Sequence, residues 1–245
     1  MENFEKNSYL ENKSETDAKY FLGEVFTELE PFTFSIVRKL KESIDSGEYD
    51  VLIGDDASGR IPTLVLRGII NERKRKLNPK LKSVESEIKT RFVAGGQVEN
   101  KEELKTAFSK IKLECPGKAL VVTEYVSSGK SIERIAKTLK DADMSFDVAT
   151  LTTNIESIEI PAESKFIYGE LIHNDFYEDN PPAFYDIPEL SGVIKDSRPK
   201  SYAIPLTKEL VADEDELKDI QEKIGMARKD VDLLIKKTLK EVWGE

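Results

Sequence analysis

The chain has 245 residues, a formal net charge of −10, one histidine and one cysteine. A single cysteine excludes an intramolecular disulfide, and a single histidine argues against a zinc site. The apolar runs are too short to cross a membrane, and the first residues lack the basic and apolar regions of a secretory signal. We therefore expect a cytoplasmic protein with no membrane partner, and the negative charge also disfavours nucleic acid as a partner.

The amino-terminal part of the chain is predicted to be helical. Apolar residues at helical spacing predict one helix over residues 17–29 and a second over residues 33–46, with an interruption at Pro31. We therefore expect an amino-terminal helical extension, residues 1–32, ahead of the main domain.

Strands and helices alternate over the middle of the chain. Short apolar runs predict strands at residues 49–54, 89–94, 119–123, 147–152 and 165–169. The helices between them are expected after Pro62 and over residues 101–111 and 131–141. This alternation predicts an α/β fold with a parallel sheet over residues 33–172.

The remainder of the chain divides into a loop-rich part and a helical part. Residues 173–206 contain five prolines and are predicted to be loop-rich, and residues 207–245 are predicted to form a final helical segment. The apolar spacing between Leu217 and Leu234 fits either a coiled-coil seam or a helix folded back on its own domain.

Four consecutive cations, residues 73–76, lie at the end of the helix that follows Pro62. Cations at a helix carboxyl terminus complement its dipole, so a solvated helix end is one interpretation. Contact with phosphate or RNA is the other.

A polar loop follows the strand at residues 49–54. Gly59 permits close backbone approach, and Arg60 can bind a phosphate through two nitrogens. Asp55 and Asp56 are candidate ligands for Mg²⁺, which favours few carboxylates together with substrate phosphates. A solvated turn for the two acids and a surface ion pair for Arg60 remain alternatives.

A second polar loop follows the strand at residues 119–123. Backbone N–H groups and hydroxyls at a helix amino terminus can wrap a phosphate, which points to Val126, Ser127, Ser128, Gly129, Lys130 and Ser131. The carboxylate of Glu124 can accept hydrogen bonds from two ribose hydroxyls. A simple helix cap is the alternative. If the two strands are neighbours, both loops face one crevice at the carboxyl ends of the sheet.

Residues 121–131, Val-Val-Thr-Glu-Tyr-Val-Ser-Ser-Gly-Lys-Ser, resemble the PRPP-binding motif of type I phosphoribosyltransferases. That motif is a hydrophobic strand, two acids, two variable residues and a Thr/Ser-Gly-x-Thr/Ser loop. The strand and loop at residues 51–60 fall where the family has its pyrophosphate-binding loop. The resemblance covers about residues 33–170 and implies a Rossmann-like core with helical additions at both ends. The chain departs from the motif at Thr123, where the family has its first acid.

The resemblance implies a Mg²⁺-dependent phosphoribosyltransferase that uses PRPP, or a nucleoside monophosphate in reverse, with a nucleobase-like acceptor. Glu124 and the adjacent Thr123 would meet the ribose, and the second loop would hold the 5′-phosphate. Ser58, Gly59 and Arg60 would meet the pyrophosphate. Lys89 and Arg91 are candidate charge stabilisers in a segment, residues 89–117, that corresponds to the family's mobile catalytic loop. Residues 173–206 would recognise the acceptor base, with candidate stacking residues Phe176, Tyr177 and Tyr185.

Two other functions stay open. A protein of the same fold that binds PRPP or a nucleotide without turnover would fit the threonine at position 123. A P-loop NTPase would require Glu124–Ser131 to act as a phosphate loop, although Glu124 then replaces its first glycine. The resembled family often forms homodimers, so a homodimer is an expected assembly.

Overall fold

The computed structural model describes residues 24–79, 87–93, 101–172, 193–194, 204–205 and 214–245. The expected acceptor region at residues 173–206, with its three candidate aromatic residues, lies outside the described residues except for two short strands. These are β6 (Val193–Ile194) and β7 (Ile204–Pro205), which pair antiparallel.

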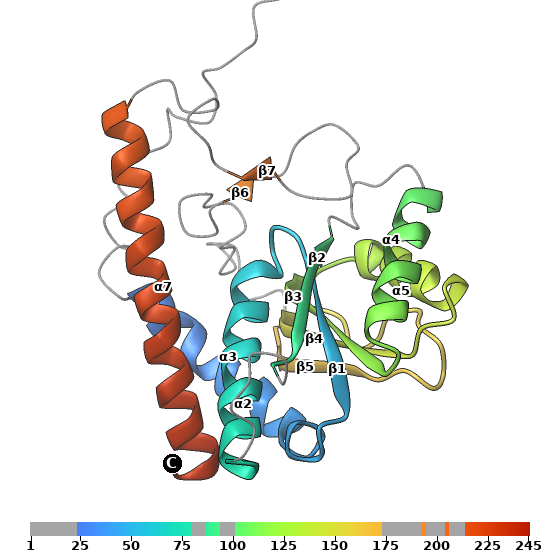
Figure 1. The fold of residues 1–245 in the computed structure, drawn as a ribbon, viewed down its shortest axis with the longest axis horizontal. Helices are drawn as coiled ribbons and strands as arrows, with labels where there is room; N and C mark the ends of the chain where they lie inside the picture. Colours follow the sequence, from blue (N-terminus) through green and yellow to red (C-terminus); the bar gives the residue numbers. More distant parts are fainter. Residues whose placement is uncertain (1–23, 80–86, 94–100, 173–192, 195–203, 206–213) are drawn as a thin grey trace, which may run out of the picture.

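The centre of the molecule is a five-stranded sheet in the order β2-β1-β3-β4-β5, and all its pairs are parallel (Figure 1). Its strands are β1 (Tyr49–Asp55), β2 (Lys89–Val93), β3 (Lys118–Val126), β4 (Phe146–Thr153) and β5 (Phe166–Leu171). The prediction of a parallel α/β sheet is confirmed. From β1 the chain moves outward to β2 and then returns to β3 on the other side of β1, so the strand order reverses between β1 and β3.

Helices cover both faces of the sheet. The connecting helices are α3 (Arg60–Leu77), α4 (Lys101–Glu114) and α5 (Lys130–Asp141). One core joins sheet residues such as Leu52 and Leu120 to α3 and to two further helices, α2 (Glu24–Ser46) and α7 (Glu214–Trp243). The other core joins Val51 and Val121 to α4 and α5. Because successive strand residues point to opposite faces, the continuous apolar runs feed both cores, which gives a three-layer Rossmann-like arrangement.

Helix α2 (Glu24–Ser46) runs without a break through Pro31, so the predicted interruption is wrong. Proline removes one helical hydrogen bond but does not prevent the helix from continuing when packing holds it in line. Leu29 and Ile36 are 1% exposed on either side of Pro31 and belong to the same core. Their burial keeps the two halves on one axis.

Helix α7 (Glu214–Trp243) lies along α2 and α3, so it folds back on its own domain. Leu234 and Leu239 are buried in the same core as α3. A Cβ at Gly68 would lie 2.9 Å from Cγ1 of Ile235 and closer still to its Cδ1. Helix α7 therefore packs closely against α3 at Gly68. No helix in the described part of the chain is long and apolar enough to span a membrane.

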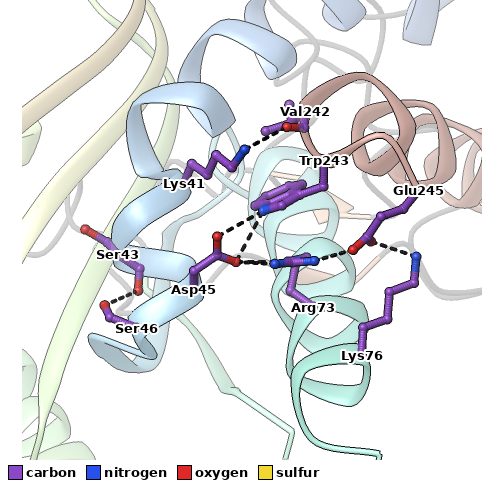
Figure 2. A network of polar contacts seen from close by, with 9 residues as sticks. All are labelled: Lys41, Ser43, Asp45, Ser46, Arg73, Lys76, Val242, Trp243 and Glu245. Atoms are coloured by element: carbon purple, nitrogen blue, oxygen red, sulfur yellow. Dashed lines mark hydrogen bonds and ion pairs between the residues drawn. The ribbon is translucent and has the colours of Figure 1, made fainter.

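A polar cluster fixes the carboxyl-terminal end of α7 to α2 and α3 (Figure 2). The indole nitrogen of Trp243 donates to Oδ2 of Asp45 at 3.1 Å. Arg73 donates to Oδ1 of the same carboxylate through Nε and Nη2, at 2.9 and 2.7 Å, and its guanidinium stacks 4.8 Å from the centre of the Trp243 ring. Arg73 also pairs with Glu245, to which Lys76 donates at 2.7 Å.

Contacts at the same helix end show what holds the cation run at residues 73–76. Arg73 is only 8% exposed and is held by two carboxylates. Arg75 pairs with Glu72 and Glu87. Three of the four cations thus pair with acids of the same chain, and the buried Arg73 does not fit a fully solvated helix end; contact of this run with phosphate or RNA stays a prediction.

Candidate functional site

The two predicted loops lie at the same edge of the sheet. Strands β1 and β3 are parallel neighbours, with Gly54 opposite Val122, so the loops that leave their carboxyl ends are adjacent. The strand order also reverses between these strands, and in open α/β sheets this is where ligands bind. The two loops are therefore neighbours at one edge of the sheet, which is the condition that the sequence argument set for a shared crevice.

The first loop, residues 55–60, is docked onto β3. The hydroxyl oxygens of Ser58 and Thr123 lie 3.0 Å apart in a hydrogen bond, and Ser58 Oγ also donates to the carbonyl of Asp55 at 3.3 Å. A Cβ at Gly59 would lie 2.6 Å from the Asp55 amide nitrogen and still closer to the carbonyl oxygen of Val122. The predicted close backbone approach at Gly59 is thus an approach to β3.

Arg60, the first residue of α3, is held in a fixed orientation. Its Nε donates to Oδ1 of Asp56 at 2.9 Å and its Nη2 donates to Oδ2 at 2.7 Å. Its guanidinium lies 4.3 Å from the centre of the Phe92 ring. The Asp56 side chain is 1% exposed and that of Arg60 is 23% exposed, so this is a partly buried, two-point ion pair. It leaves Nη1 of Arg60 outside the pair.

This ion pair bears on the candidate metal ligands. Both carboxylate oxygens of Asp56 accept hydrogen bonds from Arg60. Asp55, the last residue of β1, is 5% exposed. Within the described ranges, no group of three or more His, Cys, Asp or Glu side chains is arranged to hold a metal ion. A magnesium site here would consequently rely on one carboxylate and on oxygens of the substrate.

Strand β3 is longer than predicted and runs to Val126. Thr123 and Glu124 therefore lie within the strand, and each is 1% exposed. The reason is continued pairing with β4, whose Thr150 and Thr152 donate from their hydroxyls to the carbonyl oxygen of Glu124, at 3.2 and 3.3 Å. Only three residues then separate β3 from α5, which is too short for the phosphate loop of a P-loop NTPase.

The second loop presents an open helix amino terminus. Gly129 precedes α5 with a φ of +73°, a conformation that favours glycine. The first intrahelical bond shown runs from the Glu133 amide to the Gly129 carbonyl, so the preceding amides of the first turn have no partner in the helix. The hydroxyls of Ser127, Ser128 and Ser131 make no hydrogen bond to any described residue, and the first two serines and Lys130 are exposed. This arrangement can receive an anion.

The sequence analysis missed the residues that support this loop. The backbone amide of Asn154 donates to the Val126 carbonyl at 3.3 Å, and its side-chain nitrogen, in the orientation that satisfies its surroundings, donates to the Ser127 carbonyl at 2.9 Å. Thr153 donates to the Val126 carbonyl at 3.0 Å. The sequence offered one signal for Thr153 and Asn154, their position directly after the strand predicted at residues 147–152, since neither belongs to a motif.

Lys89 and Arg91 are not brought together with the two loops. They lie opposite Val51 and Ile53, so Lys89 is four residues before the end of β2, about 13 Å at 3.3 Å per residue. Lys89 donates to the Glu114 carbonyl at 3.0 Å, and Arg91 pairs with the Glu114 carboxylate. Both cations therefore contact the end of α4.

A cavity of about 800 Å³ lies elsewhere, between α3 and α7. Glu87 on its wall accepts from Arg67 at 3.1 Å and from Arg75 at 2.9 Å. These two ion pairs offset charge on the cavity wall.

Comparison with known proteins gives limited information. No family model and no curated protein matches the chain. Among solved structures, a hypothetical protein from Neisseria gonorrhoeae with bound ppGpp is 17% identical, with a TM-score of 0.34 over 58% of this chain and 80% of that one. A purine phosphoribosyltransferase from Pyrococcus horikoshii Ot3 is 14% identical, with a TM-score of 0.33 over 63% and 91% of the two chains. Scores this low carry no argument about function.

Proposed function

We propose that the chain binds PRPP at the edge of the sheet between β1 and β3 and acts as a Mg²⁺-dependent phosphoribosyltransferase on a nucleobase-like acceptor. The observation that supports this most directly is the adjacency of two complementary loops. One ends in the fixed guanidinium of Arg60, and the other surrounds the open amino terminus of α5. PRPP carries phosphate groups at both ends of a ribose, which matches two neighbouring anion sites.

In this proposal each loop binds one part of PRPP. The 5′-phosphate accepts hydrogen bonds from the backbone amides at the amino terminus of α5 and from the hydroxyls of Ser127 and Ser128. The carboxylate of Glu124 accepts hydrogen bonds from ribose hydroxyls between the two loops. The pyrophosphate is oriented by Arg60, whose guanidinium is already held by Asp56 and so loses little freedom on binding. This positioning stabilises the charge that develops on the leaving group.

Asp55 is the acid that would hold a magnesium ion, since Asp56 is engaged with Arg60. A single protein carboxylate completed by phosphate oxygens and water fits the preference of this ion. The bound ion would neutralise charge on the pyrophosphate.

A second candidate function is the binding of PRPP or a nucleotide without turnover. The observation in its favour is Thr123, whose hydroxyl contacts Ser58 at the position where the resembled family has an acid. This function uses the same two loops. The two candidate functions therefore share ligand binding and differ only in whether the phosphoribosyl group is transferred.

Titration calorimetry with PRPP and Mg²⁺, followed by an assay of pyrophosphate release with a panel of bases, tests both candidates. Arg60→Ala should weaken PRPP binding by at least tenfold, because it removes a charged contact worth about 1.5–3 kcal/mol. The matched control is Arg38→Ala, since Arg38 is 55% exposed and pairs with Glu241 on the surface.

Binding with pyrophosphate release supports the enzyme, and binding without release on any base supports the regulatory protein. Failure of the unmodified chain to bind PRPP contradicts both. If Arg60→Ala and Arg38→Ala weakened PRPP binding equally, Arg60 would not be a contact of the ligand.

A further inference from the structure

We propose that Thr123 is a positioning residue for the first loop and leaves ribose recognition to Glu124, an inference that rests on the proposed PRPP site. Thr123 lies at the first acid position of the resembled motif, yet its side chain is turned to the loop. Its Oγ1 is 3.0 Å from Oγ of Ser58, and the two residues are 1% and 8% exposed.

The direction of this hydrogen bond follows from the second contact of Ser58. A hydroxyl has one proton and two acceptor positions. Because Ser58 Oγ donates to the Asp55 carbonyl, at 3.3 Å, it accepts from Thr123. The threonine thus supplies the proton for the pair, which an ionised carboxylate at the same position cannot do.

The bond controls the part of the loop that carries Arg60. Ser58 lies between Asp56 and Arg60 in sequence, and the next residue, Gly59, is packed against the carbonyl of Val122. Loss of the Thr123 hydroxyl would leave the buried Ser58 oxygen short of a donor, and the loop would be less well fixed on β3. Thr123 therefore acts on the pyrophosphate through Ser58 and the loop, without touching it.

The local charge explains why a hydroxyl suits this position. Asp55, Asp56 and Glu124 are already 5%, 1% and 1% exposed at this edge of the sheet. A further carboxylate at residue 123 would add another buried negative charge, which costs free energy through desolvation and like-charge repulsion. Thr123 and Ser58 therefore form one hydrogen-bonded unit at a position where a hydroxyl is favoured over a carboxylate.

Binding of two separate probes to the full chain tests this inference. Inorganic pyrophosphate with Mg²⁺ reports on the first loop, and ribose 5-phosphate reports on the second loop and the ribose. The variants are Thr123→Val, Ser58→Ala, their double mutant and Thr123→Ser, which retains the hydroxyl.

Thr123→Val and Ser58→Ala should each weaken pyrophosphate binding about fivefold, the equivalent of about 1 kcal/mol for one hydrogen bond. The double mutant should be no weaker than either single mutant, and Thr123→Ser should bind like the unmodified chain. The affinity for ribose 5-phosphate should be the same in all four variants as in the unmodified chain. A general loss of structure would lower both affinities together, so the selectivity between probes identifies a positioning role.

Three results would overturn the inference. Thr123→Val weakening ribose 5-phosphate as much as pyrophosphate would make Thr123 a ribose contact. Additive losses in the double mutant would show that the two residues act independently. An unmodified chain that binds neither probe would refute the proposed function itself, and the inference with it.

Discussion

Replacing Gly59 with alanine tests the docking of the first loop on β3. The added Cβ would lie 2.6 Å from the Asp55 amide nitrogen and 2.9 Å from the Asp55 carbonyl oxygen, with the Val122 carbonyl closer still. All three obstacles are backbone atoms, so no side chain can rotate away to make room. Overpacking typically costs about 1–3 kcal/mol, and rigid obstacles place this change at the upper end, about 3 kcal/mol. For a chain of this size that corresponds to a melting temperature lower by about 6–12 °C.

Thermal unfolding and pyrophosphate titration on the same protein give the measurement for Gly59→Ala. Both the melting temperature and the affinity should fall, because the loop must leave β3 to admit the methyl group. Gly225→Ala is the matched control, since its Cβ would meet nothing within 4 Å and it lies inside α7. Alanine there should stabilise the helix by about 0.5–1 kcal/mol. A Gly59 variant that melts and binds like the unmodified chain would refute the docked loop.

Three further changes probe other parts of the structure. Trp243→Phe, which removes the indole donor to Asp45, should lower the free energy of unfolding in urea by about 1 kcal/mol, and an unchanged midpoint would contradict the polar cluster at the end of α7. Hydrogen bonding to Lys118 lowers the pKa of Glu48, so this contribution is present above the ordinary glutamate pKa of about 4.3 and is lost as pH falls through the lowered value. Glu48→Gln should therefore make the free energy of unfolding fall less steeply in acid, and an unchanged slope would exclude the pair. Asn154→Ala should weaken ribose 5-phosphate binding about fivefold and spare pyrophosphate, because the side chain supports only the second loop.

The sheet was predictable because its signals are local. Each strand is a short apolar run, and both faces are covered, so runs such as residues 119–122 are buried throughout. The order of the strands was not predicted, since pairing depends on contacts between distant segments. The neighbouring placement of β1 and β3 entered the sequence argument as a condition, and the structure supplies it.

The predicted site residues also differ in whether a local sequence signal is enough to identify them. Gly129 could be assigned because it stands in the Ser-Gly-x-Ser part of the resembled motif, and the structure gives it a φ of +73°, which glycine favours. Lys89 and Arg91 were chosen for their charge within the segment that corresponds to the resembled family's mobile loop, and pairing with β1 places them along β2 at the end of α4. Charge identifies candidates, but register decides which of them reach the carboxyl edge of the sheet.

At Thr123 the sequence motif and the contacts in the structure must be considered together. Compared with the resembled motif, Thr123 stands in place of an acid, which argues against transfer. In the structure its hydroxyl meets Ser58, a residue 65 positions earlier, so the apparent loss is balanced by a contact that the sequence cannot display. Under the proposed function, the ribose site then depends on Glu124 alone, and the contact between Thr123 and Ser58 fixes the first loop before the ligand arrives. Under the proposed function, a loop fixed in advance lowers the entropic cost of binding whether or not transfer follows, so PRPP affinity is the property that this contact would favour most directly.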